Sequence, residues 1–385
     1  MFSILIFIVV LGVLVFVHEL GHFLTAKFHG IHSDEFGFGF PPRLAGVYKD
    51  DESGRYRIVW GSREVATKNT IYSLNWIPLG GFVKIKGEDG IDITEEKDSL
   101  AEKSAWVRIQ VTVAGVVMNL IMAWVLIAIV LMIGLPQPIE DSEADKYADA
   151  RVQIMAVAPN TPAAAMGIQP GDVIKKIDGT EIASVEQVGT YIKNHKGQDI
   201  SVEVNRFGKE LTLHGTPRTE VKEGEGALGI SYSLTATVQH GFFQAIAKGF
   251  VTTWTITFAI LGAFGDMIAS LFGGTSSTAG DLTGPVGIVY LTKQMSDLGI
   301  AYLLQFAALL SINLAIINIL PIPALDGGRI LFILIEKIKG RPMNQQIENM
   351  IHQIGFTLLL LLMLFVTIKD LHTFKIFEKI GGLFM

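Results

Sequence analysis

The chain has 385 residues, 50% of them hydrophobic and 18% charged, and its mean hydropathy is +0.43. A net charge of −6 gives no basic footprint for nucleic acid, and the apolar content excludes disordered and collagenous classes. The chain has no cysteine, which excludes disulfides, cysteine-ligated metals and cysteine nucleophiles. Any chemistry must therefore rest on His, Asp, Glu and Ser side chains.

The charged residues are unevenly distributed along the chain. None of the 31 Lys and Arg or 37 Asp and Glu residues lies in the stretches 1–17, 109–135, 298–325 and 349–368. A helix that crosses a bilayer needs about 20 mainly apolar residues. The pattern therefore predicts a mainly α-helical polytopic membrane protein with four transmembrane helices, at 1–25, 107–135, 298–328 and 349–369.

The first apolar run lacks the basic start and the small-residue cleavage site of a signal peptide, so we expect it to be retained as a membrane helix. The segment 26–106 that follows is polar but rich in aromatic residues, and Phe82, Val83 and Lys84 belong to a stretch with period-two alternation. This predicts a β element at the membrane surface. A small solvated hairpin that links two helices is an equally open alternative.

Residues 150–232 form the clearest water-soluble segment. Thr161-Pro162 is typical of a helix start, Gly167 of a helix end, and Asp178-Gly179 of a two-residue hairpin turn. These signals predict an inserted α+β domain. Lys and Arg near the predicted spans are more numerous on the side of 26–106, which places that side in the cytoplasm and the inserted domain outside.

Residues 242–272 are apolar enough for a further span, with Lys248 and Asp266 near the ends. If this segment crossed the bilayer, Asp326 would lie on the opposite face from His18 and His22. We therefore expect an amphipathic or interfacial helix here.

The first apolar run ends in His18-Glu19-Leu20-Gly21-His22. Two histidines four residues apart lie on one face of a helix and can bind one metal ion, and in such motifs the intervening Glu is a general base. Ionisable groups are costly within a membrane and are functional by default. The alternative is that the histidines only mark the exit of the helix into the interface.

A catalytic zinc site needs three protein ligands and an open position. Asp326 follows 28 uncharged residues and stands between two prolines and two glycines, a setting that can aim a carboxylate inward at membrane depth. The alternative is a plain helix end with Asp326 among the lipid headgroups. His352 is the main rival as third ligand; weaker rivals are His29, His32, His195, His214, His240 and His372.

Asn313 and Asn318 are polar residues within the third predicted span. Hydrogen bonding between helices explains Asn313. For Asn318 an equally open possibility is a hydrogen bond to a substrate backbone or to a developing oxyanion.

Several motifs occur in an order that resembles the site-2 protease family of intramembrane zinc metalloproteases, in particular the bacterial regulator-of-sigma-E protease group. They are HELGH (18–22), FGFGFPPRL (36–44), IPLGGFVKIKGED (77–89), AGVVMN (114–119), GPVGI (284–288) and NILPIPALDGGR (318–329). Residues 150–232 resemble bacterial PDZ domains over their whole length. The best-known members of the group have two PDZ domains, and this chain has room for one.

The resemblance implies that His18, His22 and Asp326 bind Zn²⁺, that Glu19 is the general base, and that Asn318 contacts the substrate. It also implies a membrane-reentrant β element that holds the unwound substrate as an added strand, in which we include Gly80, Gly81, Phe82, Val83 and Lys84. The expected location is the bacterial inner membrane, with the active site near the cytoplasmic face.

We therefore expect an intramembrane zinc endopeptidase that cleaves single-span membrane proteins, such as anti-sigma factors or signal-peptide remnants. The expected partners are such substrates, the lipid bilayer, and an extended peptide or a C-terminus at the PDZ domain. Two alternatives are a membrane-anchored PDZ scaffold with a structural or absent metal, and a metal-dependent membrane hydrolase of lipid or isoprenyl substrates.

Overall fold

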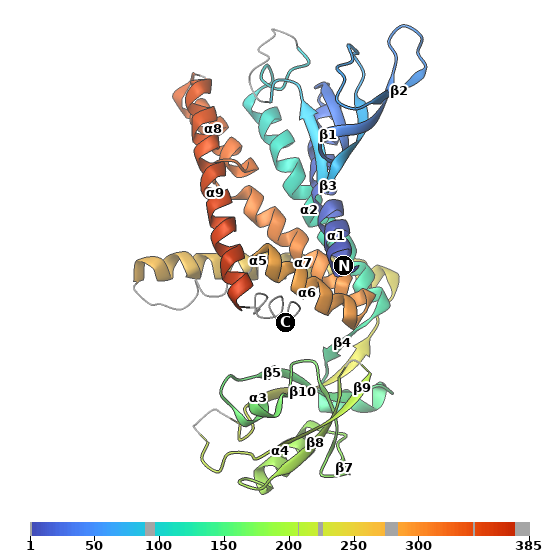
Figure 1. The fold of residues 1–385 in the computed structure, drawn as a ribbon, viewed down its shortest axis with the longest axis vertical. Coiled ribbons are helices and arrows are strands. Elements are labelled where there is room, and N and C mark those ends of the chain that lie inside the picture. Colours follow the sequence, from blue (N-terminus) through green and yellow to red (C-terminus); the bar gives the residue numbers. More distant parts are fainter. Residues whose placement is uncertain are drawn as a thin grey trace, which may run out of the picture. The chain divides into compact units, whose positions relative to one another are not determined.

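The computed structural model describes residues 2–88, 97–206, 208–221, 226–273, 284–341 and 343–373. The last residue of the GGFVKIKGED motif, Asp89, lies outside the described residues. The helices are α1 (Phe2–Phe28), α2 (Ala105–Ile133), η1 (Asp141–Lys146), α3 (Pro162–Met166), α4 (Val185–Asn194), α5 (Phe242–Gly273), α6 (Pro285–Leu298), α7 (Ile300–Ile319), α8 (Asp326–Lys339) and α9 (Gln345–Thr373) (Figure 1). The chain divides into two compact units, Val130–Gln244 and the remainder.

Five helical segments are long and apolar enough to cross a membrane: Ser3–Phe28, Ala105–Ile133, Phe242–Met267, Ile300–Ile319 and Gln346–Leu371. Four spans were expected, and the additional candidate is the segment that we expected to lie at the interface. The segment Phe242–Met267 counts as a candidate span on its length and composition alone. The interfacial position of 242–272 stays a prediction.

The segment expected as one helix over 298–328 is interrupted. Helix α7 ends at Ile319, just before Pro321, and α8 begins at Asp326. Proline cannot donate a backbone hydrogen bond and clashes with the preceding helical turn, so Pro321 and Pro323 separate the two helices. Asp326 is therefore the first residue of a new helix rather than the last part of the third span.

The segment between α1 and α2 forms a sheet in the order β2-β1-β3, with β1 (Ser33–Lys49), β2 (Tyr56–Trp60) and β3 (Ile71–Ile85). Phe36 of β1 has two partners, Tyr72 and Val83, so the first half of β1 lies between the two halves of β3. The second half of β1 pairs with β2 and with the first half of β3. Among the described residues, 81–85 consequently has a strand partner on one side only.

The sheet packs against α1 through aromatic side chains and through close backbone contact. The Phe23 and Phe36 rings stack with centroids 4.5 Å apart. A Cβ atom on Gly80 would lie 2.6 Å from the Val15 side chain, and one on Gly81 would lie 2.7 Å from Cα of Phe16. These glycines therefore let the edge segment 81–85 lie directly against the helix that carries His18 and His22.

The unit Val130–Gln244 contains a seven-stranded sheet in the order β4-β10-β5-β6-β8-β9, with β7 paired to β6. The strands are β4 (Leu135–Pro138), β5 (Arg151–Val157), β6 (Val173–Ile177), β7 (Thr180–Glu181), β8 (Ile200–Arg206), β9 (Lys209–Gly215) and β10 (Ile230–Val238). Val152, Ile154, Val188, Val202 and Leu234 are among its buried core residues. This is the α+β unit expected from the sequence.

Three local predictions in this unit are confirmed. Thr161 caps α3 by accepting a hydrogen bond from the Ala164 amide, and Gly167 ends the helix in the left-handed conformation. Asp178 and Gly179 have φ angles of 47° and 77° and join β6 to β7. Positive φ at both central residues is the requirement of the tight hairpin turn that Asp-Gly favours.

Candidate functional site

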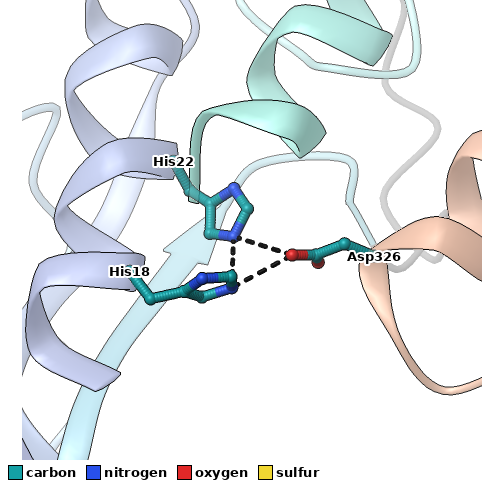
Figure 2. Close-up of side chains that lie close together, drawn as sticks. All are labelled: His18, His22 and Asp326. Carbon is teal, nitrogen blue, oxygen red and sulfur yellow. Dashed lines mark hydrogen bonds and ion pairs between the residues drawn. The ribbon is translucent and has the colours of Figure 1, made fainter. Parts of the chain in front are cut away.

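Three potential metal ligands from two helices converge at one point (Figure 2). Oδ2 of Asp326 lies 3.0 Å from Nε2 of His18 and 3.4 Å from Nε2 of His22. The two Nε2 atoms are 3.1 Å apart. Both imidazoles are buried, with 7% of each residue exposed. The structure thus brings together the three residues that the sequence singled out, across more than 300 positions of chain.

The backbone around Asp326 explains why its carboxylate faces α1. Ala324 has φ of +79°, which turns the chain sharply just before α8. A Cβ atom on Gly327 would lie 2.1 Å from the Leu320 carbonyl oxygen, and one on Gly328 would lie 2.5 Å from that of Ile322. Only glycine fits at these two positions, so the Gly-Gly pair allows the first turn of α8 to fold back on the loop that precedes it.

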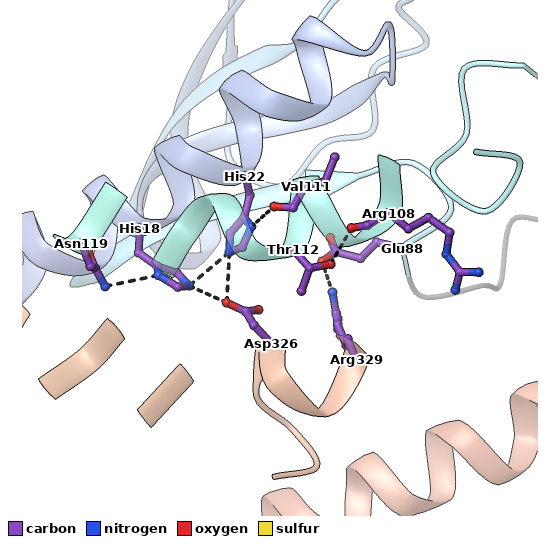
Figure 3. Close-up of polar contacts among 9 residues, drawn as sticks. All are labelled: His18, His22, Glu88, Arg108, Val111, Thr112, Asn119, Asp326 and Arg329. Carbon is purple, nitrogen blue, oxygen red and sulfur yellow. Dashed lines mark hydrogen bonds and ion pairs between the residues drawn. The ribbon is translucent and has the colours of Figure 1, made fainter. Parts of the chain in front are cut away.

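Helix α2 supports both imidazoles from the side (Figure 3). Nδ1 of His22 lies 2.8 Å from the Val111 carbonyl oxygen, which can only accept, so Nδ1 carries the proton. The lone pair of the neutral ring is then on Nε2, which faces Asp326. This tautomer is the one that a metal ligand requires.

Asn119 stands in the corresponding position beside His18. Its amide lies 3.3 Å from Nδ1 of His18, and its Oδ1 is buried without a hydrogen-bond partner among the described residues. A half-turn of the amide exchanges its oxygen and nitrogen. Oδ1 would then accept a hydrogen bond from the Nδ1–H of His18 and leave the Nε2 lone pair free to bind a metal. Metal binding by His18 would require that orientation.

The α1–α2 contact depends on glycine. A Cβ atom on Gly115 would lie 2.4 Å from Nε2 of His22 and 2.6 Å from Cε1 of His18, and one on Gly21 would lie 2.4 Å from the Ala114 carbonyl oxygen. Any side chain at Gly115 would occupy the space beside the imidazoles. The two glycines therefore set how closely the histidines approach α2.

The donor set fits Zn²⁺. Four-coordinate zinc with ligand bonds of about 2.0–2.1 Å separates its ligand atoms by about 3.3 Å, close to the three separations of 3.0, 3.1 and 3.4 Å between ligand atoms. Two imidazole nitrogens and one carboxylate oxygen are also ligand types that zinc prefers. Within the part of the chain that the structure describes, this is the one group of at least three such residues within 4.8 Å.

Glu19 lies beside this group and is not one of its three ligands. Its carboxyl is close enough to interact electrostatically with His18, His22 and Asp326. A Cβ atom on Gly81 would lie 3.1 Å from Cβ and Cγ of Glu19, so the edge segment 81–85 touches the Glu19 side chain. The carboxylate, the three ligands and the free strand edge thus share one region.

The other expected site residues differ in their placement. Gly80 and Gly81 are buried against α1, Phe82 and Val83 are half-buried, and Lys84 is exposed and pairs with Asp34 at 3.1 Å. Asn318 is half-buried near the end of α7 and is not part of the cluster of three. Its contact with substrate stays a prediction.

The rival ligands whose side chains the structure describes lie outside the cluster. Nδ1 of His352 accepts a hydrogen bond from the Ala324 amide at 2.8 Å. His32 lies 3.5 Å from Asp34, and His195 stacks on Tyr191 with centroids 4.1 Å apart. The side chain of His372 lies outside the described residues. His352 thus contacts the loop before Asp326 instead of the ligand group itself.

Ion pairs connect α8 to α2 and to the end of the β element. Arg108 of α2 donates to Glu336 at 2.7 Å. Arg329 pairs with Glu88, which follows the edge segment (Figure 3). The helix that begins with Asp326 is therefore linked to α2 and to the end of the β element. Such partly buried charge-assisted hydrogen bonds fix orientation as well as adding stability.

Sequence reasoning did not assign roles to Val111, Gly115 and Asn119. The signal that pointed to this region is the AGVVMN motif, which contains the latter two residues. Their roles become visible only when α2 is packed against α1.

Comparisons with known proteins agree with this geometry. The family model described as Peptidase family M50 matches residues 6–362. The regulator of sigma-W protease RasP of Bacillus subtilis is 30% identical over 96% of this chain and 98% of its own length. The zinc metalloprotease RasP of Geobacillus kaustophilus is 30% identical over 97% of this chain and 98% of its own length.

Among solved structures, the PDZ domain of an SdrC-like protein from Listeria monocytogenes is 26% identical over 21% of this chain and 86% of its own, with a TM-score of 0.20. At that score the match adds nothing to the assignment. The family match over most of the chain and the full-length relatives identify this chain as a member of peptidase family M50, the site-2 protease family of zinc metalloproteases.

Proposed function

We propose that His18, His22 and Asp326 hold the catalytic zinc ion of this intramembrane peptidase and that Glu19 is its general base. The observation that carries the proposal is the convergence of the three ligand atoms within 4.8 Å beside the Glu19 side chain. The ion would supply Lewis acidity toward a peptide carbonyl and toward water. Glu19 takes the proton from the attacking water and returns it to the leaving amide nitrogen.

The edge segment 81–85 holds the substrate as an added strand. A helical substrate satisfies its own backbone hydrogen bonds, so it must unwind before water can reach a peptide bond. The edge of this segment that faces away from β1 offers replacement backbone partners to the unwound segment. The contact between Gly81 and Glu19 supports a position of the scissile bond next to the base. Asn318 contacts the substrate backbone or the developing oxyanion.

The unit Val130–Gln244 serves as an extracytoplasmic PDZ domain. Among the described residues, the outer strands of its sheet, β4 and β9, have a strand partner on one side only. Such a sheet edge can accept an extended peptide as an added strand, which supports a peptide-binding role. A pocket of about 480 Å³ lies beside the Gly229 turn and is lined by residues that include Thr161 and Arg218. A peptide C-terminus suits this pocket, because its carboxylate can accept hydrogen bonds from backbone amides of the turn and lie near the positive charge of Arg218.

The substrates are single-span membrane proteins, including anti-sigma factors and signal-peptide remnants. The Bacillus subtilis relative is a regulator of sigma-W protease, which supports this substrate class. The protein resides in the bacterial inner membrane with the active site near the cytoplasmic face. The distribution of Lys and Arg between the loops supports this orientation.

The test uses purified full-length protein and a model single-span substrate. Glu19→Gln keeps the ligand set and removes the proton acceptor, so we expect about one zinc per chain and loss of cleavage by a factor of at least 10². Retained cleavage contradicts the assignment. Less than about half a zinc per chain, unchanged by His22→Ala, would instead favour a membrane-anchored PDZ scaffold.

A further inference from the structure

His352 is a histidine within a membrane-spanning candidate, the α9 segment Gln346–Leu371, and it is not one of the three clustered ligands. Polar side chains at membrane depth are costly and are retained where they have a partner. The partner of His352 is a backbone amide: Nδ1 lies 2.8 Å from the Ala324 nitrogen, which can only donate. Nδ1 is therefore the acceptor, and the neutral ring carries its proton on Nε2.

The amide that His352 binds belongs to a loop that needs support. Ala324 has φ of +79°, a conformation that is unfavourable for any residue with a Cβ atom. Such a conformation persists only where surrounding contacts hold it. Asp326 follows two residues later, so the direction in which its carboxylate points depends on this turn.

A second residue of α9 brings the helix against the same loop. Gly355 lies three residues after His352 and therefore on the same helix face. A Cβ atom on Gly355 would lie 2.5 Å from Cβ of Pro323 and 2.7 Å from its carbonyl oxygen. The His352 ring also packs 5.2 Å from the buried Phe332 ring of α8. Through this face helix α9 thus contacts both the turn and α8.

We propose that His352 is a positioning residue for the metal ligand Asp326. By accepting the Ala324 amide, it holds the strained turn in the form that directs the Asp326 carboxylate at His18 and His22. This inference rests on the proposed role of Asp326 as a zinc ligand. It gives α9, which contributes no residue to the ligand group, a defined part in building the centre.

The test compares two substitutions of similar size. His352→Asn keeps a hydrogen-bond acceptor, because Oδ1 of Asn is bonded to Cγ, as Nδ1 of His is. His352→Leu fills a similar space but has no acceptor. For His352→Leu we expect zinc affinity to fall about 10- to 100-fold, the range measured for residues that orient metal ligands. We expect kcat to fall by a similar factor with KM changed less than about twofold. His352→Asn should stay within about threefold of the wild-type protein in both.

Zinc affinity is measured by competition with a chromophoric chelator on the full-length metal-free protein in detergent, so this readout does not depend on cleavage. Equal zinc affinity in the Leu variant and the wild-type protein overturns the proposal, as does loss of affinity in the Asn variant equal to that in the Leu variant. Glu19→Gln is measured alongside. If Glu19→Gln remains active, the proposed catalytic site is wrong; if it is inactive while His352→Leu is unaffected, only the role of His352 is wrong.

Discussion

The two imidazoles are placed by residues of α2 that carry no chemistry of their own. The Val111 carbonyl fixes the tautomer of His22, the Asn119 amide lies beside His18, and Gly115 leaves room for both rings. The Ser311 hydroxyl of α7 donates a hydrogen bond to the backbone carbonyl oxygen of Asn119 at 2.7 Å. This bond connects α7 to the part of α2 that supports the imidazoles. The two imidazoles are therefore oriented through hydrogen bonds and close packing at once.

Gly115→Ala is expected to abolish zinc binding or to reduce it at least tenfold. A methyl group there would lie 2.4 Å from Nε2 of His22, and the rings cannot move away without leaving Asp326. Zinc content of the purified variant checks this. Gly262→Ala in α5 is the matched control, because a Cβ atom there would have no described atom within 4 Å beyond the local backbone of its own helix, and alanine favours a helix. Normal zinc content in Gly115→Ala would contradict the packing argument.

At the residue scale, the sequence indicates the proposed ligands more clearly than the residues that position them. His18 and His22 are visible from their helical spacing, and Asp326 from the uncharged residues before it. The role of Asn119 depends on contact with a residue 101 positions earlier, and one sequence carries no record of such a contact. The same holds for His352, whose polar character suggests a ligand as readily as a hydrogen-bond acceptor.

The C-terminal part of helix α9 contacts the GPVGI motif (284–288). The Gly287 amide, in the first turn of α6, donates to the Asp370 carboxylate at 2.8 Å. A Cβ atom on Gly284 would lie 2.8 Å from the Val366 side chain. Asp370 is buried, with 3% exposed, so this contact at the start of a helix is shielded from solvent. The motif that the sequence left without a role thus attaches α6 to α9.

Asp370→Leu is expected to lower the free energy of unfolding by about 1–3 kcal/mol, since it leaves a buried amide of α6 without an acceptor. Unfolding by denaturing detergent in mixed micelles measures this. Asp370→Asn retains an acceptor oxygen and should be affected less. Equal stabilities of the Leu variant and the wild-type protein would show that the contact contributes nothing.

The sequence predicts some helices and strands better than it predicts how they are arranged. The apolar runs predict α1, α2, α7 and α9, and the alternation around Phe82, Val83 and Lys84 predicts a strand. The arrangement of β1 and β3 does not follow, because each strand bends back and pairs in two registers. Side-chain alternation specifies which face of a strand is buried but not which of several strands lies next to it.

At the scale of the whole molecule, the unit Val130–Gln244 is stabilised as a water-soluble domain is. Arg206 forms two hydrogen bonds of 2.7 Å with the buried Asp172. Asp178 accepts from the Ser201 amide at 2.6 Å and from the Tyr191 hydroxyl at 3.0 Å. Burial is the largest single influence and raises the pKa of Asp178, but these hydrogen bonds together outweigh it and leave the pKa below its ordinary value of 3.8.

A lowered pKa favours the charged form in the folded state, so Asp178 stabilises the unit at pH values above its unfolded pKa. This contribution is lost as the pH falls through the folded pKa. We expect hydrogen-exchange protection factors of β6 to β8 in the full-length protein to decrease between pH 5 and pH 3. Asp178→Asn retains the acceptor without the charge and should show a smaller decrease. Identical pH profiles for the two proteins would contradict this account.

The division into a membrane part and an inserted domain follows from the sequence, because charge is confined to the segments outside the apolar runs. The number of spans does not, since the segment 242–267 satisfies the same composition test as the others. Whether such a helix crosses the bilayer depends on its neighbours and on the topology of the whole chain.

The free edge at 81–85 has a consequence for how a cleavage position would be chosen. A peptide added to this edge contacts it mainly through backbone atoms, which are the same for every residue. Sliding the peptide by one residue turns all its side chains to the opposite face, whereas sliding it by two restores them. The enzyme would then select a bond by strand register, and alternative cuts in one substrate would fall two residues apart.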